Sequence, residues 1–379
     1  MKNNWQAKKL GEVLEYEQPT QYIVKSTSYK DDYETPVLTA GKSFILGKTK
    51  EKSGIFPTKD LPVIIFDDFT TATKFVNFPF KVKSSAMKIL HPVKNVSDAK
   101  FLFYIMQNIS FDHTGIHKRY WISEYSKIKI LLPPLTEQKR ITKILDELIE
   151  KIEKARENAE KNIQNSKELF ESYLQSVFTN PEKDWAREKL GDILQKTETI
   201  NPLNEPSKEF IYVDVSSINK KTFSIENTTL VKGKDAPSRA RKLIKTNDVI
   251  YATIRPTLKR IAIVPENLNE QVCSTGYFIL RSKDVLINKL IFYFLQSNDF
   301  NEKMERLQKG ASYPAVTDKE IKNQIILFPK SIARQKAIIT KLDTLSVKTK
   351  KLESTYKQKL ESLEELKKSI LKRAFNGDL

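Results

Sequence analysis

The chain has 379 residues, with 65 Lys and Arg against 47 Asp and Glu, and a formal net charge of +18. This length suits about two domains. The single cysteine, Cys273, excludes an intramolecular disulfide framework and a multi-cysteine zinc site, and favours the reducing cytoplasm. The longest apolar runs, such as Leu61–Phe66, are far shorter than the ~18 residues of a membrane span, and the polar N-terminus carries no recognisable secretory signal. The excess of positive charge favours a polyanionic partner, above all nucleic acid.

The charge is not concentrated in a tail. Residues 1–135 carry 20 basic and 13 acidic residues, a net charge of +7, and residues 179–332 carry a net +6. The segment between them, 136–178, has 8 basic and 9 acidic residues, and residues 333–379 carry a net +6. Two large segments of mixed composition therefore each hold a positive excess, and a neutral segment separates them.

Local patterns predict the secondary structure in chain order. The first large segment reads as mixed α/β, with strands at 63–66, 86–90 and 127–132 and an amphipathic helix at 98–109. A long helix follows over 136–178, with Thr136 as its N-cap. The second large segment repeats the plan, with strands at 210–215, 248–253, 277–280 and 325–328 and a helix at 285–297. A second long helix then runs to the C-cap signal Asn376-Gly377.

An internal repeat accounts for this order. Trp5-Gln-Ala-Lys-Lys-Leu-Gly matches Trp185-Ala-Arg-Glu-Lys-Leu-Gly at an offset of about 180 residues. Four further landmarks recur in the same order, namely the Phe-Tyr pairs at 103 and 292, the strands at 130 and 326, the Gln residues 138 and 335, and the phenylalanines 178 and 375. The two halves therefore share one frame.

The long helices carry apolar residues at steps of three and four, which favours a coiled coil over a core helix. Since each helix alone is too narrow to bury its apolar seam, we expect the two to pack on each other. Alternatively, each lies across its own globular segment, or the helices mediate dimerisation. The residues expected at the helix or subunit interface are Ile141, Leu145, Leu148, Ile152, Phe178, Ile338, Leu342, Leu345, Leu352, Leu363, Ile370 and Phe375.

Polar loops rich in Lys and Arg lie between the predicted elements of both segments. Such side chains neutralise phosphates, and Arg, Lys, Ser and Thr also read base edges. For any single lysine, a solvated surface charge is the better explanation, so the prediction depends on the clusters. The expected DNA contacts are Lys42, Lys48, Lys50, Lys52, Thr71, Thr73, Lys74, His117, Lys118, Arg119, Tyr120, Lys234, Arg239, Arg241, Lys242, Arg255, Lys259, Arg260, Lys309, Ser312 and Tyr313.

Signatures of catalysis are missing from the sequence. No two glycines are separated by one residue, so the chain lacks the Gly-x-Gly-x-x-Gly dinucleotide fingerprint and the usual methyltransferase loop. The Gly41 to Thr49 stretch resembles a phosphate-binding loop with one residue too many between its glycines. His113 and His117 lack a third metal ligand, and Cys273 has no nearby histidine. We therefore predict no catalytic residue, no metal site and no cofactor in this chain.

The order of variable segment, long helix, variable segment and long helix resembles the DNA-specificity (S) subunit of type I restriction-modification systems. The resemblance covers the whole chain and rests on the Trp…Leu-Gly start of each half, Leu132-Pro-Pro-Leu-Thr-Glu-Gln-Lys-Arg-Ile141, and the ending Phe375-Asn-Gly-Asp-Leu379. The second helix start departs from the pattern, because Arg334 stands where the first has Glu137.

This resemblance implies an α+β fold in which two mixed α/β target recognition domains, 1–135 and 181–332, each read one half of a split DNA site. The helices 136–180 and 333–379 would pack antiparallel with pseudo-twofold symmetry, act as a spacer, and dock two modification (methyltransferase) subunits and the restriction (motor-nuclease) subunits of a prokaryotic cytoplasm. S-adenosylmethionine and ATP with Mg²⁺ would bind those partners. A coiled-coil adaptor that binds other proteins, or an enzyme with an unrecognised site, remains the alternative.

Overall fold

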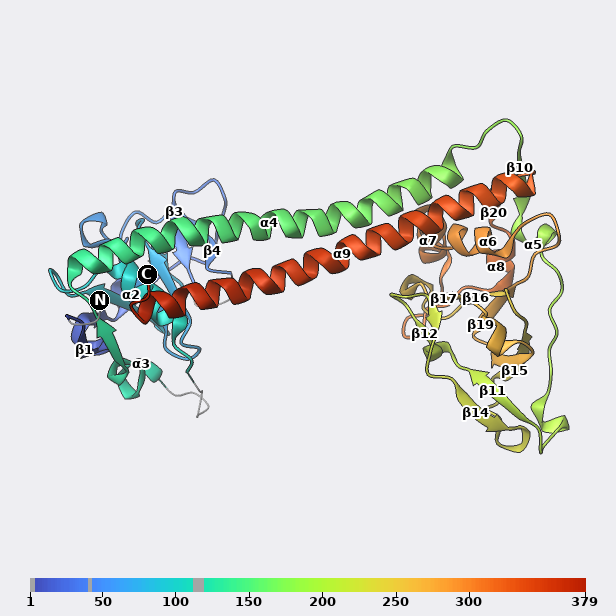
Figure 1. Ribbon diagram of the computed structural model, residues 1–379, viewed down its shortest axis with the longest axis horizontal. Coiled ribbons are helices and arrows are strands. Elements are labelled where there is room, and N and C mark those ends of the chain that lie inside the picture. Colours follow the sequence, from blue (N-terminus) through green and yellow to red (C-terminus); the bar gives the residue numbers. More distant parts are fainter. Residues whose placement is uncertain (1–3, 40–42, 112–118) are drawn as a thin grey trace. The chain divides into compact units, whose positions relative to one another are not determined.

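The computed structural model describes residues 4–39, 43–111 and 119–379, and the chain divides into two compact units. Unit 1 comprises Met1–Ala159 and Gln358–Leu379, and unit 2 comprises Glu160–Lys357. Each unit thus contains one of the two large segments together with part of both long helices, α4 (Leu135–Thr179) and α9 (Ile332–Phe375) (Figure 1). The described residues include no helix that is long and apolar enough to cross a membrane.

Unit 1 is built on two larger sheets and a two-stranded ribbon. Its four-stranded sheet has the order β2-β8-β5-β6, its three-stranded sheet the order β4-β3-β7, and β1 pairs with β9. The strands are β1 (Gln6–Lys9), β2 (Leu14–Glu17), β3 (Thr35–Leu38), β4 (Ile45–Thr49), β5 (Val63–Asp67), β6 (Thr73–Val76), β7 (Lys81–Val82), β8 (Met87–Pro92) and β9 (Lys129–Leu132). The short helices are α1 (Leu10–Val13), α2 (Ala99–Asn108) and α3 (Tyr120–Ser123).

Unit 2 repeats this architecture with additions. Its sheets have the orders β17-β16-β19 and β14-β11-β18-β15, with ribbons β10-β20 and β12-β13. The strands are β10 (Trp185–Lys189), β11 (Glu209–Val213), β12 (Ile218–Asn219), β13 (Ser224–Ile225), β14 (Thr229–Lys232), β15 (Ala240–Ile244), β16 (Val249–Ala252), β17 (Ile261–Ile263), β18 (Gln271–Ser274), β19 (Tyr277–Leu280) and β20 (Ile325–Pro329). The short helices are α5 (Leu190–Ile193), α6 (Asn288–Phe294), α7 (Asn298–Leu307) and α8 (Asp318–Lys322).

The strand pairings show that the sequence repeat is also a structural repeat. In unit 1, β3 pairs antiparallel with β4 and parallel with β7, and in unit 2, β11 pairs antiparallel with β14 and parallel with β18. Likewise β5 lies between β8 and β6, as β16 lies between β19 and β17. Phe66 pairs with Lys88 in unit 1 and Tyr251 pairs with Phe278 in unit 2, so Phe66 corresponds to Tyr251 and Lys88 to Phe278. Unit 2 differs by the hairpin β12–β13 and the edge strand β15.

Both long helices begin inside the apolar core of one of the two large segments. Ile141 and Leu145 of α4 pack with Leu102 of α2 in the main apolar cluster of unit 1, and Leu371 of α9 belongs to the same cluster. In unit 2, Leu342 of α9 and Leu174 of α4 join the equivalent cluster. Because every one of these side chains is at most 4% exposed, a helix start and a helix end are anchored in each unit by hydrophobic burial.

The predicted elements agree with the structure to within a few residues at their ends. The first long helix begins at Leu135, so Thr136 lies in its first turn and is not the N-cap that the sequence suggests. The helix predicted over 285–297 is shorter, Asn288–Phe294, because a second helix, α7, starts at Asn298. The second long helix ends at Phe375, and Gly377 has the positive φ of 74° expected just beyond a helix C-terminus.

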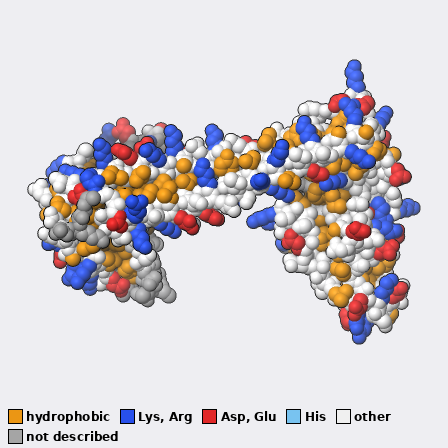
Figure 2. All heavy atoms as spheres, viewed as in Figure 1, with side chains coloured by type: hydrophobic (Ala, Val, Ile, Leu, Met, Phe, Trp, Pro, Cys, Tyr) orange, Lys and Arg blue, Asp and Glu red, His pale blue; other side chains and the backbone are white. Residues whose placement is uncertain are grey.

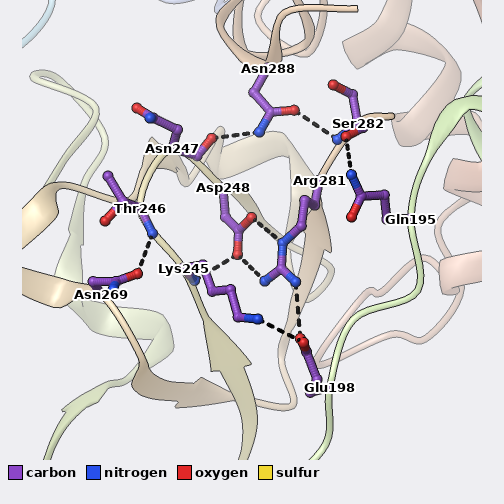
Figure 3. Close-up of polar contacts among 10 residues, drawn as sticks. All are labelled: Gln195, Glu198, Lys245, Thr246, Asn247, Asp248, Asn269, Arg281, Ser282 and Asn288. Atoms are coloured by element: carbon purple, nitrogen blue, oxygen red, sulfur yellow. Dashed lines mark hydrogen bonds and ion pairs between the residues drawn. The ribbon is translucent and has the colours of Figure 1, made fainter. Parts of the chain in front are cut away.

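A polar network around the buried Asp248 holds one end of the central sheet of unit 2 (Figure 3). Arg281 donates from Nε and Nη2 to the two carboxylate oxygens of Asp248, each at 2.8 Å, and from Nη1 to Glu198 at 2.9 Å. Asp248 is 1% exposed, and a bidentate partner compensates for the loss of its hydration. Asn288 extends the network, since its amide donates to the Asn247 carbonyl and its oxygen accepts from the Ser282 N–H.

Candidate nucleic-acid interface

Two loops meet at one corner of unit 2, at the C-terminal end of β16. The loop 253–260 leaves that strand, and the loop 308–317 comes between α7 and α8. The Val316 N–H donates to the Thr253 carbonyl at 3.0 Å, and the Arg255 N–H donates to the Pro314 carbonyl at 2.6 Å. Backbone hydrogen bonds therefore tie together the two loops that the sequence nominates independently.

The corner presents an aromatic and a cationic side chain in contact. The Arg255 guanidinium lies 5.0 Å from the ring centroid of Tyr313, a cation–π contact, and its Nη2 donates to the Ser312 carbonyl at 3.3 Å. Tyr313 is 71% exposed, and the side chain of Lys309 is 87% exposed. An exposed aromatic face next to cations is suited to stacking on bases and neutralising phosphates.

The backbone at this corner is unusual. Arg255 and Lys259 both adopt left-handed conformations, with φ of 51° and 49°, on either side of the 3-10 turn Pro256–Leu258. Such conformations disfavour side chains other than Gly, Asn and Asp, and each costs on the order of 1 kcal/mol. Strained backbone clusters at ligand-binding sites, so two basic residues held this way mark the loop as a functional candidate.

The remaining predicted contacts of unit 2 differ in their exposure and in the partners that they already have. Arg239 is exposed. It lies beside the corner, because its carbonyl accepts from the Thr275 N–H, and Gly276, which follows Thr275, accepts from the Thr253 N–H. Lys242 is held by the Tyr277 carbonyl at 2.6 Å and by Asp318 at 3.6 Å, so its ammonium already has partners. Lys234 is exposed, whereas Arg241 and Arg260 are half-buried.

Unit 1 has a corresponding corner at the end of β5. The Asp67 carboxylate accepts from the N–H groups of Phe69 and Thr70, and Thr71 has a left-handed φ of 57°. Lys74 lies 5.7 Å from the ring centroid of Phe44 and is exposed. Phe69 is 39% exposed. The corner thus again combines a left-handed residue, an exposed aromatic side chain and a lysine.

A buried ion pair lies beneath this corner. Lys88 of β8 is fully buried, and its Nζ lies 3.4 Å from Oδ2 of Asp68, which is also buried. The other carboxylate oxygen of Asp68 accepts from the Trp121 N–H at 2.8 Å, and the Asp68 carbonyl accepts from the Tyr120 N–H at 2.9 Å. Asp68 therefore joins the loop after β5 to the start of α3. The sequence pattern gave no indication of this pair, since Lys88 looks like any strand lysine.

The other contacts expected in unit 1 differ in how exposed they are. Lys50, Lys52 and Arg119 are exposed and Lys48 is half-buried. Thr73 is 6% exposed and accepts from the Gln107 amide, and Tyr120 is 1% exposed. These two side chains belong to the interior and are too buried to contact DNA. Lys42, His117 and Lys118, like His113, lie outside the described residues.

The two corners occupy equivalent positions in the repeat. The Asp68 N–H donates to the Ala86 carbonyl, as the Thr253 N–H donates to the Gly276 carbonyl. The Asp68 carbonyl accepts from the N–H of Tyr120, the first residue of α3. The Thr253 carbonyl accepts from the N–H of Val316, two residues before α8. The structure therefore builds the same loop junction twice and fills it with different side chains. On the face shown in Figure 2, Lys and Arg lie interspersed with Asp and Glu over both units.

One glutamine fixes each of the two large segments to the start of a long helix. Gln138 accepts from the Asp98 N–H and donates to the carbonyls of Val96 and Pro133, at 2.8 to 2.9 Å. Gln335 makes the matching three bonds, with the N–H of Ile287 and the carbonyls of Val285 and Pro329. Both side chains are fully buried. This geometry explains why glutamine recurs in the repeat, because only an amide both donates and accepts in this way.

A second duplicated contact lies about two turns further along each long helix. Tyr104 donates to Asp146 at 2.6 Å, and Lys100 pairs with the same carboxylate at 2.8 Å. In unit 2, Tyr293 and Lys289 contact Asp343 in the same way. Burial and the neighbouring carboxylate raise the pKa of both tyrosines well above the usual range, so each hydroxyl stays protonated and donates.

The residues expected at the helix interface take several environments. Ile141, Leu145, Ile152, Phe178 and Leu342 are buried, mostly against the recognition segment of their unit. Leu352 is 43% exposed. The others are half-buried, namely Leu148, Ile338, Leu345, Leu363, Ile370 and Phe375. Contacts between the two helices include the pair of Lys367 and Glu153 in unit 1, at 2.7 Å, and the Lys341 ammonium 4.5 Å from the Tyr173 ring centroid in unit 2.

The described part of the chain contains no group of three or more His, Cys, Asp or Glu side chains placed to hold a metal ion. Burial raises the pKa of the Cys273 thiol to about 12, which keeps it protonated and poorly nucleophilic at neutral pH.

Each unit thus combines a repeated α+β fold, anchored on parts of both long helices, with a loop corner that carries basic and aromatic side chains. The family model described as "Type I restriction modification DNA specificity domain" matches residues 2–161 and 182–362. The chain therefore belongs to this family, as a specificity subunit of the type I class with two target recognition domains.

Two curated relatives agree with this family assignment. The chain is 30% identical over 355 residues to the type I restriction enzyme EcoR124I/EcoR124II specificity subunit of Escherichia coli, covering 89% of this chain and 86% of the relative. It is 25% identical over 417 residues to the MjaVIII specificity subunit of Methanocaldococcus jannaschii, covering 99% and 93%. Among solved structures, the HsdS subunit from Thermoanaerobacter tengcongensis is 35% identical, with a TM-score of 0.43 over 45% of this chain and 44% of that chain.

Proposed function

We propose that this chain is the non-catalytic DNA-reading subunit of a type I restriction-modification enzyme, and that each unit reads one half of a bipartite site in double-stranded DNA. The observation that carries the proposal is the duplicated loop corner, at 68–72 with 119–121 in unit 1 and at 253–260 with 309–316 in unit 2. A reader built twice on one frame suits a target with two half-sites.

Arg255, Lys259, Lys309 and Tyr313 are the DNA contacts we propose for unit 2, with Arg239 beside them. For unit 1 we propose Thr71, Lys74, Arg119 and the lysines at 48, 50 and 52. Guanidinium and ammonium groups of this kind contact phosphates and guanine edges. The long helices would set the separation of the half-sites, since α4 alone has 45 residues, about 68 Å of helix at 1.5 Å per residue.

The partners that follow are two methyltransferase subunits, which would hold S-adenosylmethionine, and motor-nuclease subunits, which would hold ATP and Mg²⁺. The chain itself would transfer no methyl group. Because the proposed target is chromosomal DNA of a prokaryote, we place the complex in the cytoplasm.

Mapping of adenine methylation across the genome of cells that carry the complete system tests this function. We expect a split motif, and replacement of residues 1–135 by the corresponding segment of another specificity subunit should change only one half of it. A change in both halves would contradict the modular reading, and methyl transfer by the purified chain alone would contradict the non-catalytic role.

Single contacts are tested by DNA affinity of the assembled methyltransferase. Arg255→Ala should weaken binding by about 5- to 150-fold, the ~1–3 kcal/mol of one bidentate contact. The matched control is Arg187→Ala, because Arg187 is exposed on β10, a strand outside both loops of the corner. Equal losses for the two variants would indicate that only net charge matters.

A further inference from the structure

The hairpin of β12 and β13 is an insertion that distinguishes unit 2 from unit 1. It lies between the equivalent strands β11 and β14, which are connected by the fifteen residues 214–228. In unit 1 the corresponding strands, β3 and β4, are connected by only the six residues 39–44. The hairpin itself takes eight residues, 218–225, so the shorter connection cannot form it. Whatever the hairpin contributes is therefore contributed by unit 2 alone.

The hairpin is anchored both at its base and at its tip. Ile218 pairs with Ile225 across the two strands, and both side chains pack in the apolar cluster that includes Ile250 of the central sheet. At the tip, the ring centroids of Phe223 and of Phe292 on α6 lie 6.1 Å apart in an edge-to-face arrangement. Phe223 has a left-handed φ of 59°, which is strongly disfavoured for a bulky side chain. Such a conformation persists only where the surrounding contacts hold it.

Polar side chains of the hairpin order the turn between its strands. The Asn219 side-chain oxygen accepts from the N–H groups of Lys221 and Thr222, at 2.9 and 3.4 Å. The Glu226 carboxylate accepts from the Asn219 amide at 3.1 Å and from the hydroxyls of Thr222 and Ser224, at 3.1 and 2.6 Å. The carboxylate nearest to the turn in the chain is therefore engaged by hydrogen-bond donors of the turn itself.

Lys220 and Lys221 stand at the tip of this ordered turn. Both are exposed, and neither ammonium group forms an ion pair or a hydrogen bond with the residues that the structure describes. Two adjacent cations without a counter-charge attract a polyanion. Because the backbone that carries them is already fixed, little conformational freedom is lost when such a partner binds.

The hairpin starts beside the loop corner of unit 2. The Val215 side chain packs against Gly276, where a Cβ atom would lie only 2.6 Å from Cγ2 of the valine, and the Gly276 carbonyl accepts from the Thr253 N–H of the corner. β13 lies next to β17, the strand that follows the corner loop (Figure 1). From Val215 to Lys220 the chain spans at most about 17 Å at 3.3 Å per residue, the length of about five base pairs. A duplex bound at the corner is therefore long enough to reach both lysines.

The tip of the hairpin adjoins the long helices. Thr222 lines one hollow of about 320 Å³ together with Lys167 of α4 and Lys350 of α9, which are both exposed. Unit 2 begins at Glu160 and ends at Lys357, so each of these lysines lies about 10 Å, at 1.5 Å per residue, from the point where its helix leaves the unit. Because the helices would set the separation of the half-sites, the hairpin stands on the side of the corner where the spacer begins.

We propose that the hairpin of unit 2 contacts the DNA backbone outside the half-site, with Lys220 and Lys221 on phosphates of the adjoining spacer. The inference rests on the proposed function, because a spacer exists only if the two corners read a bipartite site. Phosphate contacts carry no direct sequence information, so the hairpin adds affinity and not specificity. Since the connection in unit 1 is too short for a hairpin, the two units bind DNA with unequal electrostatic strength.

The test is the salt dependence of DNA binding by the assembled methyltransferase, measured on a duplex that carries the split motif found by methylation mapping. The double variant Lys220→Ala with Lys221→Ala removes two phosphate contacts, which should reduce the slope of log K against log salt by about 1.8. The loss of affinity between 50 and 200 mM salt should then be about 12-fold smaller than for the unaltered protein. The methylated motif should stay the same, and Lys220→Arg with Lys221→Arg should retain the original slope.

Ethylation interference locates the contact on the DNA. Ethylation of phosphates on the spacer side of the half-site read by unit 2 should weaken binding of the unaltered methyltransferase but not of the Lys220→Ala, Lys221→Ala variant. If the interference that this variant loses lies on the outer side of that half-site, the placement on the spacer is overturned.

The matched control is Lys183→Ala with Lys196→Ala, because both lysines are exposed in unit 2, before β10 and after α5, outside the corner and the hairpin. It removes the same charge and should leave the slope unchanged. An unreduced slope in the hairpin variant, or an equal reduction in both double variants, overturns the hairpin contact while the proposed function stands. A changed motif would show that the hairpin reads bases and would overturn it as well. If the unaltered methyltransferase does not prefer the split motif to other DNA, the proposed function itself fails.

Discussion

The two loop corners share one backbone arrangement but are held together by different side chains. In unit 1, the junction of two loops is held by the buried pair of Lys88 and Asp68. At the same positions, unit 2 has Phe278 and Thr253, and the Thr253 hydroxyl donates to the Gly276 carbonyl at 3.0 Å. An ion pair is thus replaced by a neutral hydrogen bond and an apolar ring. The backbone frame is what the repeat preserves, and its filling is free to change with the DNA sequence that each unit would read.

The largest effect expected from this comparison is at Lys88. Lys88→Met should destabilise unit 1 by about 3–5 kcal/mol, because it leaves the Asp68 carboxylate buried without its counter-charge. Denaturant unfolding and hydrogen exchange of the Tyr120 and Trp121 amides measure this loss. The control is Lys322→Met in unit 2, where an exposed lysine lies 5.7 Å from the Phe278 ring centroid.

A further test of this comparison introduces the unit 2 side chains at the equivalent positions of unit 1. The double variant Lys88→Phe with Asp68→Thr removes both charges together, so it should recover most of the stability that Lys88→Met loses. A double variant no more stable than the single one would mean that the two corners are not interchangeable.

The glutamine joints should respond alike in both units. Gln138→Ala and Gln335→Ala each leave one N–H and two carbonyls without a partner, at a cost of about 1–3 kcal/mol. Thermal unfolding checks whether the two losses agree, with the exposed Gln164→Ala as control. Markedly unequal losses of stability would show that the two joints contribute differently to folding despite their matching hydrogen bonds.

Smaller effects are expected where tyrosine meets the long helices. Tyr104→Phe and Tyr293→Phe each remove one hydrogen bond to a half-exposed aspartate, which should cost about 1 kcal/mol. Unfolding midpoints measure the loss, and Tyr313→Phe is the control, since that ring is 71% exposed. A loss at one tyrosine only would break the equivalence of the two contacts.

The smallest effect concerns acid stability and separates the two units. The ammonium of Lys245 and the guanidinium of Arg281 lower the pKa of Glu198 from 4.5 to about 2. A depressed pKa stabilises the fold above pH 4.5, and this contribution is lost as the pH falls toward 2. Because Glu198 is 46% exposed, we expect less than about 1 kcal/mol. Glu198→Gln should flatten the stability curve of unit 2 between pH 4.5 and 2, and an unchanged slope would contradict this.

Much of the fold was predictable, because it depends on periodic patterns. The apolar steps of three and four gave both long helices to within a residue or two, and the runs at 63–66 and 277–280 gave buried strands. The candidate interface was predictable only in part. Composition predicts Arg255, Lys309 and Tyr313 from two separate loops, which the structure brings together at one corner. It also predicts Tyr120 and Thr73, and both of these side chains are buried. Composition does not distinguish a loop residue that faces solvent from one that turns inward.

The sequence by itself determined the duplication, the positions of the long helices and the positive charge of both readers, because these are properties of spacing and residue type along the chain. Only the tertiary structure decided which loops meet, that Lys88 is buried against Asp68, and that Gln138 and Gln335 hold the recognition segments to the helices. These contacts join residues far apart in the chain, such as the 40 positions between Asp98 and Gln138. No local pattern encodes such a pairing, since it exists only once burial has brought the backbone groups together.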